Sequence, residues 1–444
     1  MGLTPRLLDD HLRIEVNLRG SLSNNLFANQ GAIGSAVFFD PTHPVLSGKS
    51  DYGGYWEWID DATGKANVLA SKNPVALLNL RTDKSQVKRL IGNVALDYKF
   101  HFLPDLRANL NVAYDYQNGS GTVSVPTTAA AGPSSGLGTN TAYSQTKNNK
   151  TLQFYLNYVK EMGDNRLDLL AGYEYQDFLR ENNFTDNVTK ANNSYYKAQN
   201  TLVSFYGRLN YAFQNKYLFT ATLRDDGSSR FSPATRWGLF PSAALAWKVS
   251  EEDFLKNSAV FSDLKIRVGY GTTGQQDVGN DYNYLARYTL SDPTAQYQFG
   301  STFYNTLRPE GYDINFKWET TATYNAALDF GIKGGRLSGS VDFYLKKTSD
   351  LISFIPVPAG SNLTNAILTN VGSMENKGVE LTLNATPLST KGVNWDVNFN
   401  VTLNDNKITK LTNVDQADYQ GVATSAFCIV KLARKFKFVK CFKL

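Results

Sequence analysis

A strict alternation of apolar and polar side chains runs through residues 393–404, VNWDVNFNVTLN. Because successive side chains of a β-strand point to opposite faces of a sheet, one face of this segment is apolar and the other is rich in asparagine. Residues 379–386, VELTLNAT, repeat the pattern a little earlier in the chain. Two such segments, joined by a link that ends at Gly392, predict an antiparallel β-hairpin.

The same period of two recurs along most of the chain. Thirteen segments are predicted as strands: 11–20, 87–101, 106–117, 148–162, 166–180, 201–213, 217–225, 237–249, 263–271, 318–332, 336–349, 378–387 and 393–406. Strands in soluble β-sandwiches usually have about five or six residues. A tilted strand needs about nine to eleven residues to cross a membrane, so these lengths favour membrane-spanning strands.

The links between these segments are alternately short and long. Short turns are predicted near Pro104, Asp164–Asn165, Asn215, Gly334–Gly335 and Thr390–Gly392. Long links are predicted at 21–86, 118–147, 181–200, 226–236, 272–317 and 350–377. A medium link at 250–262 takes a short position, and we expect a single helical turn at Glu251–Leu255. Short periplasmic turns and long extracellular loops are the arrangement of an outer-membrane barrel.

These patterns predict an all-β fold, an antiparallel transmembrane β-barrel. Single-chain bacterial barrels close with an even number of strands, and an unpaired strand edge is not tolerated in lipid. Thirteen strands therefore predict an incomplete barrel, part of a larger one. A soluble β-sandwich shows the same alternation, but it gives no reason for links that alternate in length.

The composition separates a body from a tail. The chain has 444 residues and a formal charge of +5, and six lysines and arginines lie in its last seventeen residues, so without them the charge is −1. We therefore expect no nucleic-acid partner. We predict a partial barrel domain at 1–426 and a basic tail at 427–444, which also holds Cys428 and Cys441. A frameshift or read-through is the favoured explanation of this tail, and a basic amphipathic end that touches membrane lipid is the alternative.

No catalytic, metal or cofactor site is predicted. The three histidines lie in different elements, without the spacing of metal ligands. The glycine-rich stretch at 269–274, GYGTTG, ends a predicted strand and leads into a polar loop rather than a helix. This context does not fit a dinucleotide site, so we expect a strand rim at which the backbone takes positive φ. The sequence does not predict an enzyme.

Aromatic residues give the few candidates for ligand contact. Tyr52, Tyr55, Trp56 and Trp58 lie together in the long link at 21–86. They are candidate substrate contacts that stack on a sugar or peptide at the outer mouth, but an anchor that holds the loop down is the favoured interpretation. A second set near strand ends predicts interfacial girdles: Trp237, Trp247, Trp318 and Trp395.

Several local phrases resemble the SusC/RagA-type TonB-linked outer-membrane transporters. The strongest match is RDDGSSRF at 224–231, followed by RWGLFPS at 236–242. Further matching phrases are NQGAIGSA at 29–36, NPVALL at 73–78, KIRVGYGTTGQ at 265–275 and NKGVEL at 376–381. Each phrase is weak alone, but the set spans most of residues 10–410.

The resemblance implies a function and its partners. Members of this family import large nutrients, such as oligosaccharides or peptides, across the outer membrane of Gram-negative bacteria. They act with a SusD-like surface lipoprotein that closes over the mouth, and TonB supplies energy by pulling on a plug domain inside a barrel of about 22 strands. In this chain the strands and loops are expected to contact outer-membrane lipid, the substrate and the lipoprotein.

The sequence also departs from the family pattern. Residues 1–10 carry no secretion signal, and neither a TonB box nor a plug is found, so both are expected to precede Met1. We therefore expect the chain alone to be inactive in transport. The alternatives are a passive porin or adhesin barrel and a soluble, secreted β-sandwich that binds a ligand.

Overall fold

The computed structural model describes residues 2–130, 138–188, 193–292, 294–332 and 335–411. Beyond these it describes the backbone of β22 (Val422–Ser425), β23 (Cys428–Val430) and β24 (Val439–Cys441), in which β23 pairs with both neighbours. The rest of the predicted tail at 427–444 and Gly334 of one predicted turn lie outside the described residues.

All thirteen predicted strands are present in one antiparallel sheet. They are β3 (Leu12–Leu26), β4 (Thr82–Lys99), β5 (Leu106–Val125), β6 (Thr139–Met162), β7 (Asn165–Asp186), β8 (Ser194–Phe213), β9 (Tyr217–Ser228), β10 (Trp237–Lys248), β11 (Phe261–Gln275), β16 (Glu319–Ile332), β17 (Leu337–Ser349), β20 (Ser373–Ser389) and β21 (Asn394–Lys410). Two short strands that the sequence did not suggest, β1 (Gly2–Leu3) and β2 (Arg6–Leu7), pair with the start of β3.

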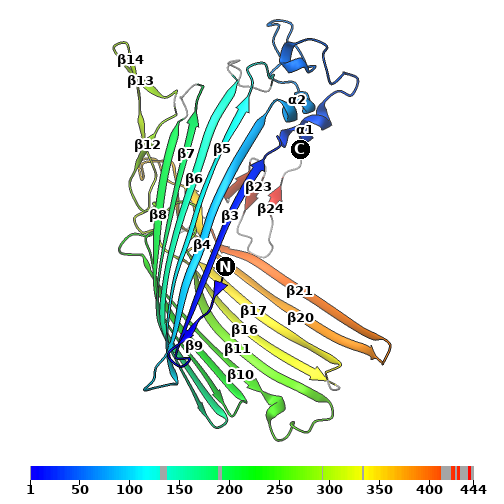
Figure 1. The fold of residues 1–444 in the computed structure, drawn as a ribbon, viewed down its shortest axis with the longest axis vertical. Helices are drawn as coiled ribbons and strands as arrows, with labels where there is room; N and C mark the ends of the chain where they lie inside the picture. Colours follow the sequence, from blue (N-terminus) through cyan, green and yellow to red (C-terminus); the bar gives the residue numbers. More distant parts are fainter. Residues whose placement is uncertain are drawn as a thin grey trace.

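Each long strand pairs with its neighbours in chain order, as in an up-and-down barrel wall. In the described residues the order runs from β1 to β21 without returning to its start, so the wall is open. Figure 1 shows one curved sheet of long, tilted strands, with β17, β20 and β21 at the lower right of the view. A single sheet of this kind excludes the β-sandwich, which needs two sheets packed face to face.

The predicted alternation of short and long links is confirmed. Tight turns join β6 to β7 and β8 to β9 at one end of the sheet, where Gln214 and Asn215 take positive φ. At the other end, the link between β3 and β4 holds α1 (Gly31–Phe38), η1 (Asp51–Gly54) and α2 (Pro74–Asn79). Two further long links hold short hairpin strands. The link between β11 and β16 holds β12 (Tyr288–Leu290), β13 (Gln296–Phe299), β14 (Thr302–Asn305) and β15 (Leu307–Pro309), and the link between β17 and β20 holds β18 (Ile352–Pro356) and β19 (Ala366–Asn370).

Across the described ranges, none of the helices combines the length and the apolar character that a membrane crossing requires.

Several strands extend further than the alternation indicated. β6 begins at Thr139 rather than at 148, and β5 continues to Val125 rather than to 117. Most of these added residues are polar or glycine, because they lie beyond the apolar band, and a pattern of apolar positions therefore does not detect them.

The medium link between β10 and β11 forms a helical turn, η2 (Val249–Glu251), which begins two residues before the predicted one. Glu252 follows it and accepts hydrogen bonds from the hydroxyl of Tyr217 (2.6 Å) and the indole Nε1 of Trp247 (3.0 Å). These donors and Lys216 hold the pKa of the Glu252 carboxyl below its ordinary value. The carboxyl therefore ties this link to the neighbouring turn between β8 and β9.

The expectation of positive φ at the glycine-rich stretch was wrong. Gly269, Gly271 and Gly274 lie inside β11 and have no positive φ. The limited space beside the backbone explains these glycines better, because a Cβ added at Gly269 would lie 2.4 Å from Oδ1 of Asn325 on β16. The glycine is needed so that the neighbouring side chain can lie across the strand.

Candidate functional site

The register of the sheet assigns every strand residue to one of two faces. Val94 pairs with Val112, which pairs with Leu152, on one face. Ala95 pairs with Asn111, which pairs with Gln153, on the other. In a membrane barrel the apolar face contacts lipid and the polar face lines the lumen. The strands therefore place two different surfaces back to back.

β10 shows the lipid face most clearly. Trp237 and Trp247 lie at its two ends on the same face, and the residues between them on that face are apolar: Leu239, Pro241, Ala243 and Leu245. Leu239 is 59% exposed and Leu245 is 56% exposed. The two tryptophans are about 34 Å apart along the strand, or roughly 25 Å along the barrel axis at a tilt of about 45°. This height matches the apolar band of an outer-membrane barrel.

The girdle prediction fits three tryptophans and was wrong for the fourth. Trp237, Trp247 and Trp395 lie on the apolar face at strand ends. Trp318 is 7% exposed, and its indole Nε1 donates a hydrogen bond to the carbonyl of Arg236. It is buried because it precedes β16 at the outer rim, where loop residues pack over it.

A row of hydrogen bonds crosses the lumen face from strand to strand. The amide of Asn93 on β4 donates to Asn111 on β5 (3.3 Å), and Asn111 donates to Gln153 on β6 (3.2 Å). Gln153 then donates to Oε1 of Glu174 on β7 (3.0 Å). Gln153 lies directly opposite Asn111 and Glu174, and Asn93 lies diagonally opposite Asn111 on the same face, so the four side chains form one continuous row.

Arg224 on β9 continues this row. Its Nη2 donates to Oε2 of Glu174 (3.2 Å) and to the hydroxyl of Ser204 on β8 (2.7 Å), and its Nε donates to Asp226 (2.7 Å). The guanidinium carbon also lies 5.2 Å from the ring centroid of Tyr206. One arginine therefore joins β7, β8 and β9. We call the set Asn93, Asn111, Gln153, Glu174, Ser204, Arg224 and Asp226 the lumen row.

A second charged cluster lies further round the same face. Arg267 on β11 forms two hydrogen bonds with Asp329 on β16, of 2.9 and 2.7 Å, and one of 3.0 Å with Asp342 on β17. Lys265 also pairs with Asp329 (2.8 Å). The lumen face thus offers amides, carboxylates and cations to polar solutes.

The extracellular loops are joined to one another at the outer rim. Arg230, after β9, pairs with Asp281 (2.7 Å) and Asp277 (3.1 Å) in the link between β11 and β16. Beside it, an apolar cluster contains Phe231 and Phe316, which are fully buried, together with Phe240 and Trp318. Buried aromatic packing and a partly buried ion pair therefore fix two loops that are far apart in sequence.

The four aromatic candidates are not brought together on one open surface. The ring of Trp56 stacks on His43 (3.8 Å between centroids) and meets Trp58 edge-on (4.9 Å). Tyr55 accepts a hydrogen bond from Asn79, and Tyr52 takes positive φ in η1. Much of the area of Trp56 is used within the loop, which favours the anchor alternative. A role of these residues in substrate contact stays a prediction.

Asn73 explains how this loop holds its shape. It is fully buried, accepts hydrogen bonds from Val75 and Ala76 at the start of α2, and donates to the carbonyl of Val45. Its own backbone N–H donates to Glu57, a carboxyl that is 6% exposed. Burial raises the pKa of Glu57, against smaller lowering effects of this N–H and of Lys72.

The residues of the lumen row were not identified from the sequence as site residues. Arg224, Asp226 and Arg230 lie in the phrase RDDGSSRF, which carried the family resemblance, so the phrase itself was the available signal. The structure assigns it a role: it supplies the hub of the lumen row, the ion pair of the loops and the buried Phe231.

Comparisons with known proteins agree with this architecture. Residues 23–427 match the family model described as TonB dependent receptor-like, beta-barrel. The chain is 43% identical over 442 residues to the TonB-dependent receptor SusC of Bacteroides thetaiotaomicron, an alignment that covers 94% of this chain and 44% of that protein. It is 31% identical over 407 residues to a TonB-dependent receptor of Formosa agariphila, which covers 87% of this chain and 39% of that protein.

Among solved structures, the RagAB peptide transporter superposes with a TM-score of 0.74 and 22% identity, over 92% of this chain and 46% of that chain. This likeness supports the fold. The chain spans less than half the length of the curated relatives it matches. The chain belongs to the TonB-dependent receptor β-barrel family, is of the SusC/RagA type, and is an outer-membrane protein of a Gram-negative bacterium.

Proposed function

We propose that this chain forms the substrate-facing wall of an importer that carries large nutrients, oligosaccharides or peptides, across the outer membrane with energy supplied through TonB. The lumen row is the observation that carries the proposal. Its amide, carboxylate and guanidinium groups can exchange hydrogen bonds with hydroxyls or peptide groups of a passing solute. The family is one of receptors and transporters, and no bond of the substrate is made or broken.

The proposed importer works with two protein partners. A SusD-like surface lipoprotein closes over the mouth and docks on the extracellular loops, which Arg230 and the Phe231 cluster hold in a fixed arrangement. TonB acts on a plug domain, and the lumen row is part of the wall against which that plug lies. The described strands supply the wall itself, so we propose that this chain needs a plug to transport.

The test uses the whole receptor in cells that depend on it for uptake. We would compare labelled oligosaccharides and labelled peptides of increasing length, with and without TonB. We expect one of these solute classes to enter only when TonB is present. Glu174→Ala and Arg224→Ala should each reduce the rate of uptake of that class. Uptake that persists without TonB would instead support the passive porin.

A matched control separates transport from assembly. Arg166→Ala removes an arginine whose weak pair with Glu161 (3.9 Å) lies beside the turn between β6 and β7, away from the lumen row. Its uptake rate should equal that of the unchanged receptor at equal surface abundance. Equal loss in all variants would point to faulty insertion and would remove the lumen row from the proposal.

A further inference from the structure

The outer face of the barrel carries a groove above the apolar band. β5 continues beyond Tyr116, the last aromatic residue on the lipid side of that strand, to Val125. Thr122 therefore lies about 20 Å further along the strand, or roughly 14 Å higher along the barrel axis. At this height a side chain has passed the lipid interface and meets whatever extends outward from the lipid headgroups.

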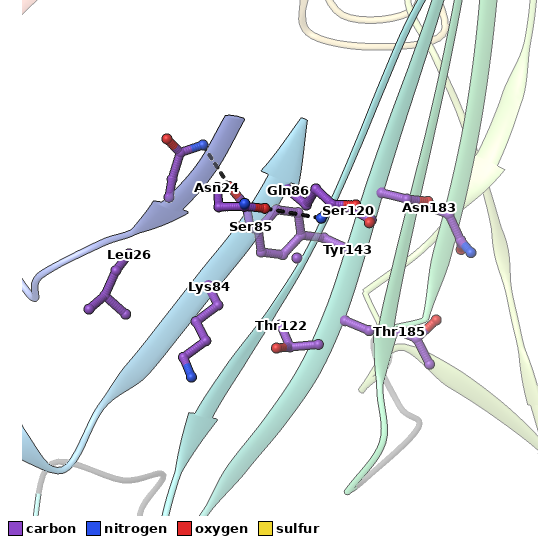
Figure 2. A pocket seen from close by; sticks show the side chains of 14 residues that line it. Asn24, Leu26, Lys84, Ser85, Gln86, Ser120, Thr122, Tyr143, Asn183 and Thr185 are labelled. Carbon is purple, nitrogen blue, oxygen red and sulfur yellow. Dashed lines mark hydrogen bonds between the residues drawn. The ribbon is translucent and has the colours of Figure 1, made fainter. Parts of the chain in front are cut away.

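The groove has a volume of about 720 Å³ and is lined by side chains of β3 to β7. Figure 2 shows side chains of this lining on neighbouring strands. Six polar side chains of the lining are exposed: Asn24, Lys84, Gln86, Ser120, Thr122 and Asn183.

The register places this groove on the lipid side of the wall. Asn24 pairs with Gln86 and Gln86 with Ser120, and the row continues through Ser144 to Asn183. Lys84 and Thr122 form the next pair, two residues further along on the same face. Tyr116 belongs to this face as well, whereas Asp115 and Arg89 of the lumen belong to the opposite one. The sheet therefore separates the groove from the transport path.

The lining favours a ligand rich in hydroxyl groups. Amide and hydroxyl side chains both donate and accept hydrogen bonds, which suits saccharides better than acyl chains. Gln86 donates to Asn24 (3.0 Å), which leaves its carbonyl oxygen free to accept from a ligand. Lys84 is the one charged group of the lining among the described residues, and it forms no ion pair with any of them.

We propose that this groove binds the saccharide of a glycolipid in the outer leaflet of the outer membrane, with Lys84 pairing with an anionic group on that saccharide. The position favours this ligand over a nutrient, because the groove lies on the outer side of the wall, just beyond the headgroups of the surrounding lipid. The inference depends on the placement of the chain in the membrane and is independent of the proposed transport.

The test measures binding of two lipids to the receptor in detergent by native mass spectrometry. One lipid carries core sugars on lipid A, and the other is lipid A alone. We expect Lys84→Gln to weaken binding of the sugar-bearing lipid by about five-fold, the effect of one exposed ion pair. Ser120→Trp, which places a large side chain in the groove, should weaken it as well. Binding of lipid A alone should stay unchanged.

Lys147→Gln is the matched control. It removes the same charge from the lumen side of β6, where Lys147 pairs with Gln117, and should leave binding unchanged. The proposal is overturned if both lipids bind equally to all variants, or if lipid A alone shows the same loss. It is also overturned if Lys147→Gln acts like Lys84→Gln, or if a soluble nutrient oligosaccharide displaces the lipid from the groove.

Discussion

Glu174 on β7 and Arg224 on β9 are joined by a hydrogen bond of 3.2 Å between Oε2 and Nη2, across the strand β8 that separates them. Ser204 of β8 bonds to the same guanidinium nitrogen (2.7 Å), so the contact spans three strands at one height of the lumen. The Glu174 side chain is 10% exposed and that of Arg224 is 32% exposed. Partial removal from water makes such a charged contact count for more than a surface ion pair.

This contact predicts a measurable coupling. Glu174→Ala and Arg224→Ala should each lower the free energy of unfolding by about 1–3 kcal/mol, because each leaves a charged partner unpaired in the wall. The double variant should cost about 1 kcal/mol less than the sum of the single variants. Urea unfolding in lipid vesicles measures all three. Strict additivity would show that the two side chains do not interact.

The loops should loosen when their buried aromatic core is removed. Phe231→Ala deletes a fully buried ring, and such deletions cost about 3–5 kcal/mol. We expect faster hydrogen exchange throughout residues 276–318, with the exchange of β9 and β10 preserved. Phe299→Ala, which removes a ring that is 70% exposed, is the control and should change little. Equal hydrogen exchange in both variants would contradict the claim that the buried ring of Phe231 stabilises these loops.

Loop 27–81 should be more stable at acidic pH. The pKa of Glu57 is raised in the folded loop, so the folded form binds the proton more tightly than the unfolded form. The stabilisation is complete below the ordinary pKa of a glutamate and is lost as the pH rises through the raised value. Fluorescence of Trp56 and Trp58, which flank Glu57, reports the transition.

Glu57→Gln gives the matched comparison for this pH dependence. The amide stays uncharged at every pH and can still accept from the N–H of Asn73. At neutral pH the variant should therefore keep the tryptophan fluorescence that the unchanged protein shows only at acidic pH. A pH profile that is the same in both proteins would show that another group titrates.

Two adjacent alanines of β10 should differ in how much an arginine destabilises the protein. Ala243 lies on the lipid face near the middle of the apolar band, and Ala244 lies on the lumen face. Ala243→Arg should lower the free energy of unfolding by about 2–4 kcal/mol, the cost of a cation at the bilayer midplane. Ala244→Arg should cost much less, since its side chain reaches water. Equal costs would contradict the assignment of faces.

The sequence predicted the strands well and their outer contacts poorly. Alternation such as that at 393–404 follows directly from burial of one face, so all thirteen strands could be placed. The upper parts of β5 and β6 consist mostly of polar residues and glycine, and no long apolar alternation marks them. Strand ends outside the apolar band are therefore set by cross-strand pairing alone.

The contacts of the candidate site depend on distant residues. The pair Arg230 and Asp281 joins residues 51 positions apart, and Glu174 and Arg224 are 50 positions apart. Trp318 was expected in a girdle because only its position near a strand end was visible, whereas its burial depends on Phe231 and Phe316. Such juxtapositions arise from the tertiary fold and have no local pattern in the sequence.

The central claim is that one sheet separates lipid from a polar lumen. Nitroxide labels attached to single cysteines at positions 241–246 of β10 test it in lipid vesicles, through relaxation by oxygen and by a water-soluble nickel chelate. We predict that oxygen reaches positions 241, 243 and 245, on the face of Trp237, and that nickel reaches 242, 244 and 246. Nickel reaching both sets equally would contradict a membrane-spanning wall.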